Sequence, residues 1–298
     1  NVWTNVGAGT GDIQPFHGYG SIAGFCSGGP YDSNTIEKIS FTSDVAGVDH
    51  GDLTVARNRG AGNSSTTEGY TAGGYPTDGT VDKFPFASTS GASNVGDLTN
   101  NRRNLCGQSS TTYGYASGGN PGAANWIDKV SFASDGNSVS VGVVLSALEH
   151  GTGQNSTTYG FIGGGGVSTT MSDVIQKFAF ASDGDAVDVA TITVARNKGA
   201  GHSSATDGFV SGGDVGGAND TIDKFSFESG SDAADHGNCY VAVYYTNGSS
   251  STTHGYNYGA TSSNMDQIQK FATASNATGS DVSDLIQDHE LPTGNQQY

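Results

Sequence analysis

Short runs of alternating apolar and polar residues recur along the whole chain, separated by clusters of Gly, Asn, Asp and Ser. Alternation over four to eight residues is typical of a β-strand with one buried face. One stretch shows the unit well, because four such runs follow one another at 52–58, 60–67, 69–74 and 81–86. The pattern predicts four short antiparallel strands.

This unit returns six times, and the lysine of the recurring motif Ile-x-Lys-Phe-x-Phe marks each copy. The lysines are separated by 45, 46, 48, 47 and 46 residues: Lys38, Lys83, Lys129, Lys177, Lys224 and Lys270. A fixed period of this length indicates repeated units that bury their apolar faces against their neighbours. Since four antiparallel strands form one propeller blade, we predict an all-β fold, a six-bladed β-propeller with four antiparallel strands per blade.

The repeats run almost from end to end, so we expect one domain over 1–298. Residues 1–12 form a leader in this interpretation, and the blades span approximately 13–57, 58–103, 104–148, 149–196, 197–243 and 244–298. The last copy is expected to supply its own fourth strand around 281–287. The leader segment 2–8 either pairs beside it to close the ring or contacts another subunit.

Composition restricts the partners and the chemistry. The net charge is −17, with 29 acidic residues against 12 Lys and Arg, which disfavours nucleic acids and anionic membranes. No apolar stretch is long enough to span a bilayer, so we expect no membrane insertion. The three cysteines lie in different repeats without metal-binding spacing, and we expect them to be small buried side chains.

Three features resemble kelch repeats over nearly the whole chain. Gly-Gly closes the second strand, aromatic residues lie in the third, and an arginine precedes the next innermost strand at Arg57, Arg103 and Arg196. The usual tryptophan of the fourth strand is missing, and the arginine is replaced in the copies with Ala147 and Val243. The resemblance implies a kelch-like propeller.

The amino-acid sequence of the repeats shows a second resemblance. Gly-Tyr-x-x-Gly-Gly followed by Ile-Asp-Lys-Phe-Ser-Phe-Ala-Ser-Asp resembles repeats in virion and tail-fibre proteins of tailed phages, especially marine ones. That resemblance implies a virion or an extracellular surface as the location, with other virion proteins and a host-surface receptor or glycan as partners.

The recurring residue types have structural explanations. Glycines of the innermost strands allow neighbouring blades to approach closely, and no helix follows them as a phosphate-binding loop would require. The aromatic pairs of the third strand are expected in the core between blades. Each repeat lysine is expected to meet an acidic or carbonyl group, with Asp52, Asp97 and Asp284 as candidates and Lys83 within about 6 Å of one.

Catalytic chemistry finds little support in the sequence. The kelch-like propeller of galactose oxidase holds copper through a Tyr joined to a Cys and through Tyr and His ligands, and this chain shows no comparable pairing of its histidines. His50, His150 and His236 are expected as polar turn residues. Asp183 with Asp185 and Asp232 with Asp235 are expected in turns, with calcium binding as the alternative. We expect no catalytic residue, no metal and no cofactor.

One face of the propeller is the expected binding surface. The length differences between repeats lie mainly in the loop between the second and third strands, and this loop emerges on the same face as the connection to the next blade. Aromatic residues of these segments are the candidate partner-binding residues: Tyr31, Tyr75, Trp126, Tyr244 and Tyr245. For Trp126, a plug over the blade core is an equal alternative.

These inferences predict a non-catalytic virion or surface-appendage structural protein, a phage tail fibre or capsid decoration. It would bind a host receptor, a glycan or a partner protein through one loop face, and a homo-oligomer is possible. Two alternatives remain open: an extracellular carbohydrate-active or oxidase-type propeller enzyme, and a kelch-type interaction adaptor.

Overall fold

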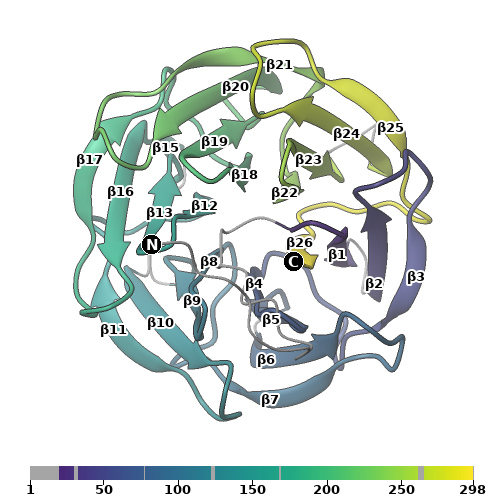
Figure 1. The fold of residues 1–298 in the computed structure, drawn as a ribbon. Coiled ribbons are helices and arrows are strands. Elements are labelled where there is room, and N and C mark those ends of the chain that lie inside the picture. Colours follow the sequence, from purple (N-terminus) through teal and green to yellow (C-terminus); the bar gives the residue numbers. More distant parts are fainter. Residues whose placement is uncertain are drawn as a thin grey trace, which may run out of the picture.

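Six four-stranded antiparallel sheets lie around a central channel in the computed structural model (Figure 1), which describes residues 20–29, 33–76, 78–121, 125–167, 169–260 and 265–297. The chain is all-β over these residues, with no helix among them. The predicted six-bladed propeller with four antiparallel strands per blade is confirmed.

Each sheet runs from an innermost strand beside the channel to an outer strand at the rim (Figure 1). The innermost strands are β4 (Ala61–Ser64), β8 (Cys106–Ser109), β12 (Thr152–Asn155), β18 (Ala200–Ser203), β22 (Asn247–Ser250) and β26 (Thr293–Gln297). The second strands are β1 (Ala23–Gly29), β5 (Glu68–Gly74), β9 (Tyr113–Ser117), β13 (Tyr159–Gly163), β19 (Asp207–Ser211) and β23 (His254–Tyr258).

The third strands carry the repeat lysines. They are β2 (Ser33–Ser40), β6 (Asp78–Pro85), β10 (Trp126–Ser131), β16 (Val174–Ala179), β20 (Asn219–Ser226) and β24 (Gln267–Ala272). The outer strands are β3 (Val48–Asp52), β7 (Ser93–Asp97), β11 (Val139–Val143), β17 (Val187–Thr191), β21 (Ala234–Val243) and β25 (Ser280–Asp284). A small hairpin, β14 (Gly166–Val167) with β15 (Thr170–Met171), lies in one loop.

The C-terminal strand closes the ring. β26 pairs antiparallel with β1, from Ala23 opposite Gln297 to Ser27 opposite Thr293, and so becomes the innermost strand of the blade that holds β1 to β3. The last repeat supplies its own outer strand β25, close to the expected 281–287. Residues 2–8, expected to pair beside it, lie outside the described residues. One blade is therefore built from both ends of the sequence.

The innermost strands approach so closely that a side chain does not fit. A Cβ added to Gly107 would lie 2.0 Å from the carbonyl oxygen of Gly62 in the neighbouring strand. The same contact recurs around the channel, with Gly153 against Gly107 and Gly201 against Gly153. Glycine is required at this position because the obstacle is backbone, which cannot turn away.

Glycine is required for a different reason in the Gly-Gly pair that ends each second strand. Gly73 has φ +67°, and a Cβ there would lie 2.6 Å from the Arg102 carbonyl oxygen. That carbonyl accepts a hydrogen bond from the Gly74 N–H at 2.8 Å. All six blades form the equivalent hydrogen bond, with Ala260 in the place of the second glycine in the last one.

Three buried ion pairs lie between the third strand and the segment after the outer strand. Arg57 meets Asp82 at 2.8 Å, Arg102 meets Asp128 at 2.9 Å, and Arg196 meets Asp223 at 2.9 Å, with every side chain at most 1% exposed. The sequence analysis grouped Arg103 with Arg57 and Arg196, and this assignment is wrong. Arg102 stands four residues after Leu98, as Arg57 does after Leu53.

Leu148 and Val243 stand at the position of this arginine in two other copies. The sequence analysis named Ala147 instead of Leu148, which is wrong. In the blade that follows each of these two copies, the residue before the repeat lysine is Gln176 or Gln269 instead of Asp. Because a buried carboxylate without a cation is costly, loss of the arginine coincides with loss of the acid.

Four of the six repeat lysines contact carboxylates, and none of these is one of the expected three. Lys83 pairs with Asp135 at 2.8 Å, in the turn after the third strand of the next blade, instead of Asp52, Asp97 or Asp284. The same ion pair between neighbouring blades joins Lys129 to Asp183 and Lys270 to Asp44. Lys224 instead pairs with Asp207 of its own blade at 3.2 Å. Lys38 and Lys177 lie over the rings of Phe25 and Tyr159.

The core lies between the blades, as the aromatic pattern predicted. Phe25 of one blade stacks on Phe86 of the next with ring centres 4.8 Å apart, and Tyr115 stacks on Phe180 at 5.0 Å. The three cysteines are buried and free, as expected.

Two histidines expected in turns lie in outer strands instead. His50 and His236 are 5% and 7% exposed, and each bonds a backbone carbonyl of the next blade. They fill core positions because the third residue of an outer strand faces the neighbouring sheet. His150 is the exception, and it lies at the channel.

Candidate functional site

The central channel is narrow and polar. It is lined mainly by glycines and by serines and asparagines, and its volume is about 70 Å³. Pockets for small molecules usually measure about 300–1,000 Å³. The channel therefore has room for a few water molecules, and a larger ligand must bind at an end of it.

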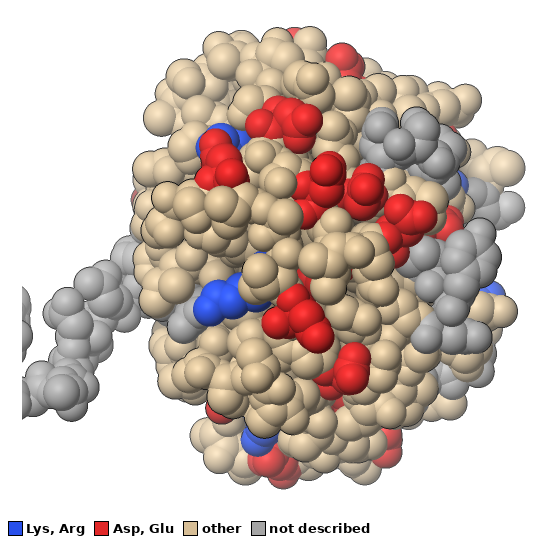
Figure 2. Space-filling view, turned by 90° about the vertical axis from the view of Figure 1, so that its right-hand side faces the viewer, with Lys and Arg blue, Asp and Glu red and all other residues tan. Residues whose placement is uncertain are grey.

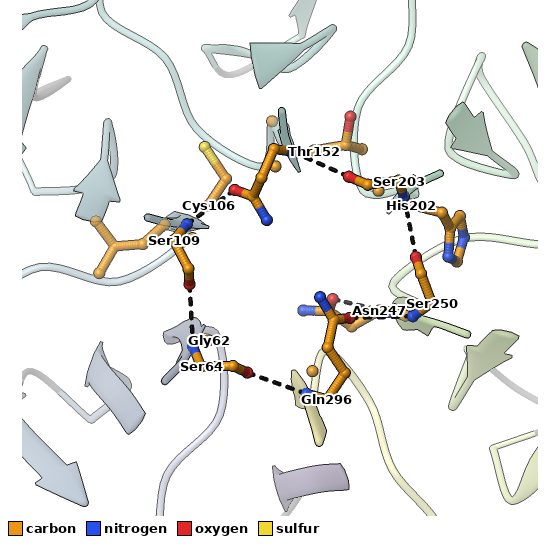
Figure 3. A pocket seen from close by; sticks show the side chains of 18 of the residues that line it. Gly62, Ser64, Cys106, Ser109, Thr152, His202, Ser203, Asn247, Ser250 and Gln296 are labelled. Atoms are coloured by element: carbon orange, nitrogen blue, oxygen red, sulfur yellow. Dashed lines mark hydrogen bonds between the residues drawn. The ribbon is translucent and has the colours of Figure 1, made fainter. Parts of the chain in front are cut away.

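A closed ring of side-chain hydrogen bonds fixes the innermost strands (Figure 3). The last or next-to-last residue of each strand donates its backbone N–H to the side chain of its neighbour, over 2.8–3.0 Å. The ring runs through Ser64, Ser109, Asn155, Ser203, Ser250 and Gln296, and back to Ser64. It leaves these groups satisfied by the protein itself.

A second ring surrounds the other mouth of the channel. Each member has φ between +49° and +64°, and its N–H donates to the carbonyl of the equivalent residue in the preceding blade over 2.8–3.1 Å. We call these six residues the mouth ring: Arg59, Asn104, His150, Lys198, Tyr245 and Leu291. Their backbones close a circle, so their side chains come to the same mouth.

The mouth ring belongs to the face on which binding was expected. Isolated bridges join the connection between blades to the loop between the second and third strands, as in Asn58 with Tyr75 and Arg103 with Asn120. Both kinds of loop therefore emerge together. We call this side of the disc the loop face.

Two arginines at this mouth share one aromatic ring. The guanidinium carbons of Arg59 and Arg103 lie 5.6 Å and 5.0 Å from the ring centre of Tyr75, which is 47% exposed. Cations at this distance from a ring face are attracted by its quadrupole. Neither guanidinium forms an ion pair or a hydrogen bond within the described part of the chain, and both Nε atoms are buried without a partner.

Opposite them the mouth ring carries a third cation and a neutral histidine. Lys198 Nζ lies 2.8 Å from Asp214 and 4.6 Å from the ring centre of Tyr245. Burial, followed by the charges of Lys198, Arg59 and Arg103, lowers the pKa of His150 to about 3. The imidazole is therefore neutral at physiological pH, and it meets Tyr245 edge to face at 5.9 Å.

The two acidic residues of this region already have partners within the protein. Glu149 accepts hydrogen bonds from Asn104 and Asn120, each at 2.8 Å. Asp214 instead forms an ion pair with Lys198. The charges of Arg59 and Arg103 thus remain without a carboxylate partner among the described residues, in a protein of net charge −17.

The five candidate aromatic residues separate in the structure. Tyr75 and Tyr245 lie at the mouth, and Tyr244 packs against Tyr245 with ring centres 5.3 Å apart. Trp126 opens β10 and is 38% exposed, with the guanidinium of the buried Arg102 lying 5.8 Å from its ring centre. This contact favours the alternative of a plug over the blade core. Tyr31 lies outside the described residues.

The two cations and the histidine of the mouth ring were missed as site residues from the sequence. Arg59, His150 and Lys198 immediately precede the first glycine of an innermost segment in three different repeats. Setting the repeats in register places them on one circle, and that was the available signal. The left-handed conformation that turns their side chains to one mouth has no comparable mark, because none of them is glycine.

The rim has the opposite charge. Figure 2 shows Asp and Glu gathered over the side formed by outer strands such as β3 and β25, where Asp49, Asp52, Asp281 and Asp284 are exposed. The cationic mouth is therefore local, and the surface around it repels polyanions.

Metal and membrane sites find no support within the described residues. No group of three or more His, Cys, Asp and Glu there is arranged to hold a metal ion. Asp185 and Asp232 instead accept backbone N–H groups of Val143 and Thr191 in neighbouring outer strands. No helix in this part of the chain could cross a bilayer.

Comparison with protein-family models finds no family that matches the sequence, and comparison with curated proteins finds no match either.

Proposed function

We propose that this chain is a non-catalytic structural protein of a virion or another surface appendage, such as a phage tail fibre or a capsid decoration. It binds a host receptor, a glycan or a partner protein through its loop face. The observation that carries the proposal is the mouth on that face. Two arginines that have no acceptor among the described residues meet exposed Tyr75 there, above a narrow channel.

The scaffold supports a binding role. Two closed hydrogen-bond rings hold the innermost strands, and the length differences between repeats lie in loops of one face. Loops on a rigid framework are where binding residues are usually found. Aromatic and arginine side chains are also the residues that contribute most to protein interfaces.

The virion part of the proposal depends on the likeness of the repeats to those of tailed-phage virion and tail-fibre proteins. The acidic, glycine-rich composition agrees with a soluble, repetitive structural protein and disfavours a role on DNA.

Mass spectrometry of purified native particles from the culture that produces this chain tests the location. We expect the chain to copurify with capsid and tail proteins at a fixed ratio through a density gradient. Recovery only in the soluble cell fraction, without particle proteins, would remove the virion proposal.

Binding of the labelled protein to intact host cells tests the loop face. We expect Tyr75→Ala and Tyr245→Ala to lower binding about tenfold or more, in line with the loss of central interface residues. Tyr240→Ala is the matched control, because Tyr240 is 49% exposed on the outer strand β21. Equal loss in all three variants, or in none, would contradict a site on the loop face.

A further inference from the structure

We propose that the mouth of the channel binds the single carboxylate of an acidic sugar, at Arg59 and Arg103. This inference rests on the proposed function and names the chemical class of its ligand. The ligand is a sugar acid, such as a sialic or uronic acid residue of a glycan.

The arginines are prepared for an anion. A guanidinium has five N–H donors and no acceptor, and its planar fork matches the two oxygens of a carboxylate. Arg59 and Arg103 use these donors on no group of the described chain, and their Nε atoms are already withdrawn from solvent. An anion would satisfy donors that the fold leaves open.

The surroundings restrict the anion to a small one. A cavity of about 30 Å³ at the mouth is lined by Arg59, Asn104, His150 and Lys198 among others. Arg103 does not line this cavity, and it is related to Arg59 through the Tyr75 ring that both cations contact. This volume admits a small polar group but not a sugar ring, so the ring would lie outside, beside the exposed Tyr75. The neutral His150 offers a hydrogen bond to a hydroxyl without competing for the charge.

Charge favours a ligand with one negative group. The rim is acidic and the whole chain carries −17, so a nucleic acid, a sulfated polymer or a strongly acidic peptide is repelled over most of its length. A sugar acid brings one carboxylate to the cationic mouth and otherwise presents neutral hydroxyls. Tyr75 and Tyr245 provide aromatic surface for the ring.

Titration calorimetry of the intact protein with N-acetylneuraminic acid and glucuronic acid tests the site, with the methyl ester of each sugar as the uncharged match. We expect at least one acid to bind about tenfold or more tightly than its ester, because a charge-assisted hydrogen bond contributes about that much. Arg59→Asn and Arg103→Asn should each weaken the acid by a similar factor.

Both substitutions copy residues that other blades already use. Asn104 occupies the position of Arg59, and Asn58 and Asn197 occupy that of Arg103, so the variants should fold. Lys83→Gln with Lys129→Gln removes two charges elsewhere and should leave the affinity unchanged. Thermal unfolding of each variant verifies the fold.

The outcomes separate the two proposals. Equal binding of acid and ester, no effect of the arginine variants, or acetate binding as tightly as the sugar acids would overturn the sugar-acid site. If neither acid binds while the chain still copurifies with particles and attaches to cells, only this inference fails. If the acids bind but the chain is absent from particles, the virion proposal fails and the site stands.

Discussion

At the scale of single residues, the repeats vary in pairs. Arg57 faces Asp82, His289 faces Glu37, and Leu148 stands in the blade before the one that carries Gln176. In every blade the acid or amide accepts a backbone N–H from the end of an outer strand or from the segment just after it. The charge on this acceptor changes together with the residue that faces it.

Breaking one buried pair tests this relation. We expect Asp82→Asn to lower the free energy of unfolding by about 3–5 kcal/mol, because Arg57 would remain charged and buried without its partner. Chemical unfolding measures the change. The double variant Arg57→Leu with Asp82→Gln copies Leu148 and Gln176, which occupy the equivalent positions in two other neighbouring blades, and should lose less. If the double variant loses as much as the single one, the paired variation has another cause.

The glycines of the innermost strands make a second prediction at this scale. Gly107→Ala should destabilise the protein by about 1–3 kcal/mol or more, since its Cβ would meet the Gly62 backbone. Gly217→Ala is the control, because a Cβ there meets nothing within 4 Å. A similar melting temperature for the two variants would contradict the account of close strand approach.

At the scale of elements, the strand that closes the ring was the least predictable part. The six repeats indicated six sheets, and alternation indicated their strands. β26 begins 21 residues after the last lysine strand ends, as the other innermost strands do. However, its sequence resembles theirs only weakly, with Thr293, Gly294 and Asn295. These 21 residues and the 46 residues from Gly248 to Gly294 relate it to the repeat, but the sequence interpretation gave the closing role to the leader instead.

A buried ion pair holds the segment before β26. His289 Nε2 lies 2.7 Å from a Glu37 oxygen, and its Nδ1 donates to the Gly28 carbonyl, with both side chains fully buried. Burial opposes the charged form, but the Cys26 sulfur and the Glu37 carboxylate outweigh it and raise the pKa of His289 to about 10. The imidazolium is therefore favoured in the folded state.

This pair predicts a loss of stability at alkaline pH. The folded pKa of His289 is above its ordinary value of 6.5, so the stabilisation is complete below about pH 6.5 and disappears as pH rises towards 10. Unfolding free energies between pH 6 and pH 10 should converge for the wild type and for His289→Leu with Glu37→Gln. A difference that stays constant, or grows with pH, would contradict the assignment.

At the scale of the whole molecule, the repeated residues determine the scaffold, whereas the candidate site is formed by residues that differ from one repeat to the next. The period in the sequence predicted the number of blades, and the loop lengths predicted the face that carries Tyr75 and Tyr245. The arginines at the mouth escaped prediction because they occur in single repeats and therefore stand outside the pattern. Specificity on such a ring depends on what differs between blades.

The central claim is that the six blades form one closed ring that presents one loop face. Hydrogen exchange of the intact protein, followed by mass spectrometry, tests it most directly. The account predicts that the amides of β26 exchange as slowly as those of β4 and β8, since all three are innermost strands of the same ring. Fast exchange throughout β26, with β4 and β8 protected, would show an open ring and contradict the account.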